Sequence, residues 1–185
     1  MEPISLIASP VAEGLEILAP QSVVVTDIGK VAFIGSYLPR KCGIATFTSD
    51  LCRSVATTYP ATTCSVLSIN DNPVGYDYDS SVRFEIEQQE MSSYQRAADY
   101  LNLDGVDVVC LQHEYGIYGG SAGSHILALL ADVSAPIVTT LHTVLRNPNP
   151  EQSRVMREII KLSSRVVVMT EYTRDMLLET YQAPQ

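Results

Sequence analysis

Two histidines each follow an apolar run that is typical of a buried strand. The run 106–112 ends directly before His113, and the run 136–141 ends directly before His142. A segment with helical spacing of apolar residues separates the two runs, so we expect them to form neighbouring parallel strands. Open α/β sheets bind their ligands outside the carboxyl ends of the strands. We therefore predict that His113 and His142 lie at one edge of a sheet, in a binding or catalytic site.

The neighbours of His113 add to this expectation. Glu114 and Tyr115 follow it directly, which places a base, an acid and an aromatic ring within three residues. Such groups can bind sugar hydroxyls or perform acid–base chemistry. A capping or loop role for this triplet, and a packing role for His142, remain alternatives. Two histidines and a glutamate also resemble a zinc ligand set, but the H-E-x-x-H spacing is missing, so we predict no metal.

A second candidate site is the segment 35–46, which follows the first apolar run. Gly43 is expected at the start of a helix, where backbone amides can approach an anion closely. Arg40 and Lys41 would add positive charge beside it. The alternative is a plain turn that needs a glycine. The segment matches neither G-x-G-x-x-G nor the P-loop, so a dinucleotide site, with Asp71 holding a ribose, is not favoured.

Three other features carry weaker signals. His125 lies within an apolar helical stretch, and we interpret it as a packing residue. The segment 119–123 is close to G-x-S-x-G in spelling, but no strand directly precedes it, which argues against a nucleophile elbow. Asp77 and Asp79 lie in a polar loop that offers too few oxygen ligands for calcium.

The composition excludes several classes of partner. The 185 residues include 12 Lys and Arg against 21 Asp and Glu, a formal charge of −9. This balance argues against nucleic acid and gives no attraction to anionic lipid. No apolar run is long enough to span a bilayer, and residues 1–16 lack the basic region of a signal peptide. Four cysteines without CxxC spacing indicate reduced thiols and a cytoplasmic protein: Cys42, Cys52, Cys64 and Cys110.

The alternation of apolar runs and helical patterns predicts the architecture. We expect strands at 31–35, 64–69, 82–86, 106–112, 136–141 and 165–169, with helices starting near 43, 91, 126, 149 or 150, and 170. Continuously apolar strands alternating with helices predict an α/β fold with a doubly wound, mostly parallel, Rossmann-like sheet and helices on both faces. We assign residues 31–185 to this domain. Residues 1–30 form an N-terminal extension with one potential strand at 22–26.

Three segments resemble a known family. They are Pro-Arg-Lys-Cys-Gly-Ile-Ala-Thr-Phe at 39–47, Leu-Gln-His-Glu-Tyr-Gly at 111–116 and Val-Thr-Thr-Leu-His-Thr at 138–143. A final apolar strand followed by Thr170 and a helix also fits. In order and spacing these segments resemble the N-terminal, acceptor-side domain of group 1 retaining glycosyltransferases, which use nucleotide sugars and have the two-domain GT-B fold.

The resemblance implies roles for individual residues. His142 would be the catalytic residue that faces the transferred sugar, and the backbone amides of Gly43 and Ile44 would approach the donor phosphate or the acceptor. The acceptor side would be lined by His113, Glu114 and Tyr115. Arg40 and Lys41 are assigned to an anionic acceptor or phosphate from their charge and position alone. No cofactor is implied.

The chain departs from the family in one large respect. We expect the nucleotide-sugar-binding C-terminal domain to be absent, and with it the basic residues that hold the diphosphate and a pair of glutamates. Cys42 also stands where many members have a second glycine. A complete enzyme would move a hexosyl unit from a nucleotide sugar to a hydroxyl or anionic acceptor. We expect this chain alone to be inactive or nearly so, because stabilisation of the departing diphosphate is a major part of such catalysis.

Other functions stay open on the sequence. The chain could be the partner of a separate C-terminal domain chain. It could also be a non-catalytic sugar- or protein-binding module, or an enzyme similar to nucleotide-sugar epimerases. Tight nucleotide binding by the isolated chain would favour the epimerase-like alternative.

Overall fold

Six parallel strands form one sheet in the computed structural model, which describes residues 28–183. The order across the sheet is β3-β2-β1-β4-β5-β6, and every neighbouring pair is parallel. The strands are β1 (Lys30–Gly35), β2 (Thr63–Asn70), β3 (Val82–Glu87), β4 (Val108–His113), β5 (Ile137–Leu141) and β6 (Arg165–Val168). The predicted α/β fold with a doubly wound parallel sheet is confirmed. The strand predicted at 22–26 lies outside the described residues.

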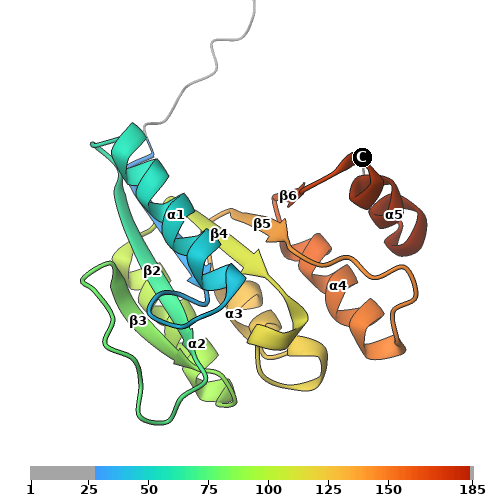
Figure 1. The fold of residues 1–185 in the computed structure, drawn as a ribbon, viewed down its shortest axis with the longest axis horizontal. Helices are drawn as coiled ribbons and strands as arrows, with labels where there is room; N and C mark the ends of the chain where they lie inside the picture. The colour runs from blue at the N-terminus through green and yellow to red at the C-terminus, as the bar shows by residue number, and fades with distance from the viewer. Residues whose placement is uncertain (1–27, 184–185) are drawn as a thin grey trace, which may run out of the picture.

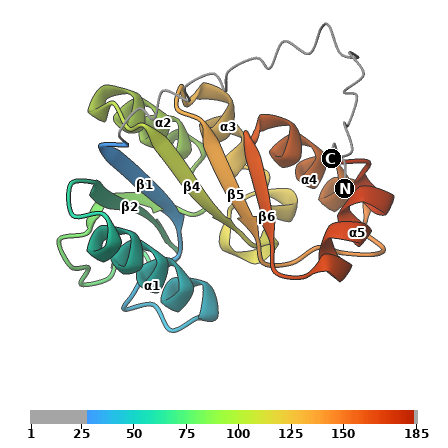
Figure 2. The ribbon, with the colours of Figure 1, turned by 90° about the horizontal axis from the view of Figure 1, so that it is seen from above.

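Helices cover both faces of the sheet, as predicted (Figures 1 and 2). They are α1 (Gly43–Thr58), α2 (Met91–Asp104), α3 (Ile126–Asp132), α4 (Pro150–Leu162) and α5 (Glu171–Tyr181). Figure 2 shows α1 on one side of the sheet and α2, α3 and α4 on the other. Within the described part of the chain, no helix has both the length and the apolar character that a membrane span requires.

The alternation of side chains along β1 explains why both faces are covered. Ala32 and Ile34 join the large apolar cluster beneath α2, α3 and α4, whereas Val31 and Phe33 join the cluster beneath α1. Successive strand residues point to opposite faces, so a strand that is apolar throughout requires a cover on each side. Full burial of a side chain such as Phe33 stabilises the fold by roughly 1.5–3 kcal/mol.

Local capping fixes where three helices begin. The thiol of Cys42 accepts a hydrogen bond from the Ala45 amide at 3.3 Å, so α1 starts at Gly43 as predicted. Asn149 and Gln152 exchange reciprocal hydrogen bonds of 2.9 Å in a capping box at the start of α4. The Thr170 hydroxyl accepts from an amide of the first turn of α5 at 3.1 Å.

The strand order creates a switch point between β1 and β4. From β1 the chain winds towards β2 and β3, and from β4 it winds the opposite way towards β5 and β6. The loops that leave these two central strands therefore separate at the carboxyl edge, and ligands of doubly wound folds bind in the crevice between such loops. Residues 36–42 follow β1, and residues 114–125 connect β4 to α3 through two short 3₁₀ turns.

Candidate functional site

The two predicted histidines lie side by side at the carboxyl edge. His113 is the last residue of β4 and stands in register with Leu141, the last residue of β5. The backbone N–H of His142 donates to the carbonyl oxygen of His113 at 3.0 Å. The predicted placement of both residues at the ends of neighbouring parallel strands is therefore confirmed.

The His142 side chain is half-buried and held from two sides. Its Nε2 lies 3.0 Å from Oε1 of Gln112, and its ring meets the ring of Phe47 edge-on, with centroids 4.8 Å apart. An amide oxygen only accepts, so Nε2 carries the hydrogen and Nδ1 is the acceptor nitrogen. Burial lowers the pKa of His142, and the nearby Glu114 carboxylate opposes this only in part. The ring is therefore neutral at pH 7.

His113 is placed beneath the site rather than on its surface. Its side chain is fully buried, stacks on Tyr118 with centroids 6.0 Å apart and meets Tyr115 edge-on at 5.0 Å. Neither ring nitrogen has a hydrogen-bond partner among the described residues. Burial lowers the pKa of His113 to about 4, and the neighbouring His142 adds to the shift. In this structure His113 is a neutral ring that supports the site from below.

Glu114 and Tyr115 point in different directions. The Thr143 hydroxyl donates to Oε2 of Glu114, and both side chains are half-buried. The Tyr115 hydroxyl instead reaches α4, where it donates to the Gln152 carbonyl oxygen at 3.5 Å. Burial raises the pKa of the Tyr115 hydroxyl. Of these two predicted ligand residues, Glu114 is the one grouped with His142.

Arg40 is fixed by partners that the sequence did not reveal. Its guanidinium forms an ion pair of 2.9 Å with Asp71 and donates to the Ser36 hydroxyl at 3.0 Å. Asp71 also accepts from the Tyr76 hydroxyl at 2.9 Å. Asp71 therefore ties the loop after β2 to the loop after β1. Lys41, in contrast, is exposed.

The N-terminus of α1 is open at the position predicted for anion binding. A Cβ atom placed on Gly43 would meet no heavy atom within 4 Å. The amides of Gly43 and Ile44 belong to the first helical turn, which has no intrahelical acceptor for them. Their N–H groups and the helix dipole favour a negative group at this end of the 16-residue helix.

Tyrosine hydroxyls clamp the loop that follows β4. The Tyr118 hydroxyl donates to the Gln112 carbonyl oxygen at 2.7 Å. The Tyr94 hydroxyl donates to the Gln88 carbonyl oxygen at 2.9 Å and accepts from the Gly119 amide at 3.0 Å. Burial raises the pKa of Tyr94 to about 12, so the hydroxyl stays protonated as a donor. The wall of the site is thus tied to α2 and to β4.

Glycines allow this loop to pack closely. A Cβ on Gly119 would lie 1.9 Å from the Gln88 carbonyl oxygen, and Gly120 and Gly123 have φ of 78° and 76°. Only glycine adopts such positive φ values freely. His125, predicted as a packing residue, lies against this glycine turn and meets Tyr94 edge-on at 5.7 Å.

Gln112 is the main site residue that sequence reasoning missed. It is 1% exposed, it holds His142, and its Nε2 has no partner among the described residues. A Cβ on Gly35 would lie 3.0 Å from the Gln112 Cβ, so any larger residue at position 35 would press on Gln112. The available signal was a polar residue at the end of an otherwise apolar strand, where a buried polar group needs a hydrogen-bond partner.

The residues that bind metals elsewhere do not gather here. Within residues 28–183, no three His, Cys, Asp or Glu side chains are placed to hold a metal ion. Cys42, Cys52, Cys64 and Cys110 are all free thiols. Burial raises the pKa of Cys52 to about 12 and that of Cys110 to about 11, which makes both thiols poor nucleophiles.

Comparison with known proteins adds no assignment. No protein-family model matches the chain, and no curated protein matches its sequence.

Proposed function

We propose that this chain is the acceptor-side domain of a retaining, nucleotide-sugar-dependent glycosyltransferase with GT-B architecture. One observation carries the proposal. The three segments that resemble this family, residues 39–47, 111–116 and 138–143, are far apart in the sequence but all reach the carboxyl edge around β1, β4 and β5. Every loop that follows a strand of a parallel sheet reaches this edge, but these three segments follow the adjacent strands β1, β4 and β5 at the switch point, where ligands of such folds bind.

The polar groups at this edge suit a sugar. Nδ1 of His142 accepts a hydrogen bond, the Glu114 carboxylate accepts further ones, and the oxygen of the Thr143 hydroxyl, whose hydrogen goes to Glu114, also accepts. Sugar hydroxyls are donors that match such a set of acceptors. Because His142 is neutral, we assign it the role of orienting a substrate hydroxyl through a hydrogen bond.

The reaction requires charge stabilisation next to these groups. The bond between the anomeric carbon and the phosphate oxygen breaks, a bond to the acceptor oxygen forms, and the acceptor hydroxyl passes its proton to the departing phosphate oxygen. A nucleoside diphosphate leaves with the electron pair. The amides of Gly43 and Ile44 at the N-terminus of α1 would stabilise part of this negative charge. A second domain or chain would hold the nucleotide.

Ligand-observed NMR tests the proposal. The probes are a free hexose, a hexose phosphate and a nucleotide sugar, each titrated with the chain and with His142→Ala. We expect the hexose phosphate to bind, the nucleotide sugar to bind no more tightly, and His142→Ala to weaken binding roughly tenfold, the effect of one lost hydrogen bond in a desolvated site.

Tyr59→Ala is the control, because it removes an exposed ring at the end of α1 that lies farthest from the proposed sugar site. It should leave the affinity unchanged at the same folded fraction, checked by circular dichroism. Tight nucleotide binding by the chain alone would contradict the proposal and favour an epimerase-like enzyme. If the chain and His142→Ala bound the hexose phosphate with equal affinity, the sugar site would not lie at this edge.

A further inference from the structure

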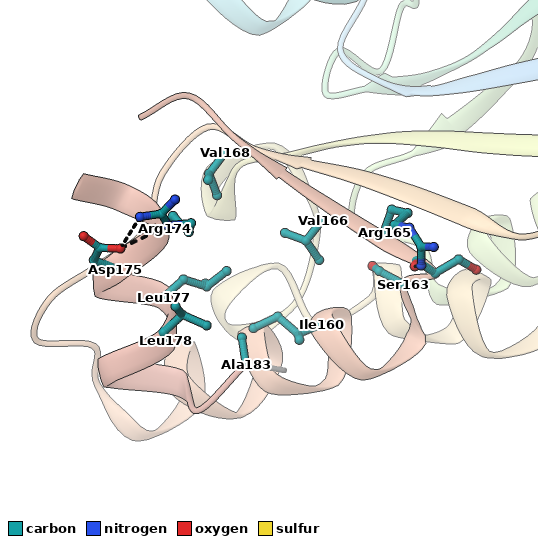
Figure 3. Close-up of a pocket in the computed structure, with 11 residues that line it drawn as sticks. Ile160, Ser163, Arg165, Val166, Val168, Arg174, Asp175, Leu177, Leu178 and Ala183 are labelled. Atoms are coloured by element: carbon teal, nitrogen blue, oxygen red, sulfur yellow. Dashed lines mark hydrogen bonds and ion pairs between the residues drawn. The ribbon is translucent and has the colours of Figure 1, made fainter. Parts of the chain in front are cut away.

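A groove runs beside β6, on the side away from β5. It lies between β6, α4 and α5, has a volume of about 710 Å³ and is shown in Figure 3. This groove is separate from the site around His142. Apolar side chains line most of it: Ile160, Val166, Val168, Leu177, Leu178 and Ala183.

One wall of the groove presents backbone groups as well as side chains. The parallel register pairs Val138 with Arg165 and Thr139 with Val166, so the N–H and C=O groups of Arg165 and Val167 point towards β5. Hydrogen-bonding direction alternates along a strand, so the N–H and C=O groups of Val166 and Val168 point away from β5. No described strand pairs with β6 on that side. Such an edge is a template for one more strand.

We propose that this groove binds one extended segment of a partner polypeptide, which adds to the sheet beside β6. Its backbone would pair with the outward groups of Val166 and Val168, and alternate apolar side chains would lie beside the side chains of these two valines. On its other face the segment would carry a carboxylate beside Arg165. That guanidinium is exposed and forms no ion pair within the described part of the chain, whose sequence is otherwise acidic.

The geometry favours a single strand over other occupants. Helix α5 closes the side of the groove opposite β6, where Arg174 and Asp175 form an ion pair of 2.9 Å (Figure 3). A second copy carries the same helix beside its own β6, so two sheets cannot join across this edge without displacing both helices. A small apolar molecule would leave the backbone groups of β6 unpaired, which is costly once water is excluded.

Amide hydrogen exchange on the full chain tests the inference. The probe is the blocked peptide acetyl-Thr-Val-Glu-Val-Thr-Val-Thr-amide, and the control peptide has proline in place of its central valine, which removes one backbone donor. We expect the probe to slow exchange of the Val166 amide roughly tenfold or more at saturation, and the control peptide to have no effect.

A pair of variants tests the charge. Arg165→Gln should weaken binding of the peptide severalfold, whereas Arg96→Gln, on the exposed surface of α2, should not. Absence of slowed exchange with the probe would overturn the inference. So would a Val166 amide already protected in the dilute free chain, which would mean that another segment of this chain fills the groove. Protection that rises with chain concentration alone would assign the groove to a second copy and overturn it too.

Discussion

Acidification should destabilise the fold through His113. This side chain is fully buried, and its pKa of about 4 in the folded state compares with 6.5 for an ordinary histidine. The unfolded chain therefore binds a proton below about pH 6.5, and the folded chain binds it only near pH 4. The contribution of neutral His113 to the free energy of unfolding is fully present above about pH 6.5, and it is lost as the pH falls towards 4. At about 1.4 kcal/mol per pKa unit, the loss is about 3 kcal/mol.

Urea unfolding at a series of pH values between about 7.5 and 4 measures this loss. His113→Phe is the comparison, because it keeps an aromatic ring on Tyr118 but cannot titrate. It also removes two buried nitrogens without partners, so we expect it to be at least as stable as the original chain at the upper pH. Carboxylates titrate in both proteins, so the difference between their pH profiles isolates His113.

A second variant separates charge from packing. Tyr118→Phe removes the hydrogen bond to Gln112 but leaves His113 buried and titratable. It should be less stable at every pH and should keep the full pH dependence of the original chain. Identical pH profiles for the original chain and His113→Phe would refute the reasoning, because His113 would then not be buried as a neutral base.

Three further substitutions follow from the geometry. Gly43→Ala should change the free energy of unfolding by less than about 1 kcal/mol, since the space for a methyl group is open. It should nevertheless lower the affinity for a hexose phosphate in an NMR titration, because the methyl group stands where the ligand approaches. Gly119→Ala should cost about 3 kcal/mol or more in urea unfolding, because its Cβ would overlap the Gln88 carbonyl oxygen at 1.9 Å. Arg40→Gln should cost about 1 kcal/mol, seen as a lower Tm, because it leaves the partly buried Asp71 without its ion pair.

The sheet could be predicted because its strands are buried on both faces. Runs such as those of β1 and β4 are apolar at almost every position, and only a covered parallel sheet requires this. The starts of α4 and α5 could also be predicted, because Asn149 and Thr170 cap these helices through local hydrogen bonds. Such signals lie within a few residues of the element that they specify.

The candidate site was harder to predict, because it depends on which face a side chain occupies. In β4, His113 shares a face with Leu111, the face covered by α2, α3 and α4. Gln112 points to the opposite face, which α1 covers. His142 reaches that opposite face too, where it meets Phe47 of α1. The strand runs placed both histidines at the right edge. The exposure of one ring and the burial of the other follow from this alternation.

The ion pair between Arg40 and Asp71 shows a second limit of prediction from the sequence. The two residues come from loops after different strands, and their contact depends on the parallel pairing of β1 and β2. The clamp formed by Tyr94 on the glycine turn is of the same kind, because it joins α2 to the loop after β4. Long-range polar contacts of this kind leave no periodic signal in the sequence.

The tyrosine clamp also has a thermodynamic consequence. A loop that becomes ordered only when its ligand arrives loses conformational entropy, and this loss subtracts from the affinity. Here the hydroxyls of Tyr94 and Tyr118 already hold the loop after β4 in the free chain. A ligand at the carboxyl edge would therefore bind to a loop that had already lost its conformational entropy during folding. Loss of either hydroxyl should weaken binding chiefly through a less favourable entropy of association, with the heat of binding little changed.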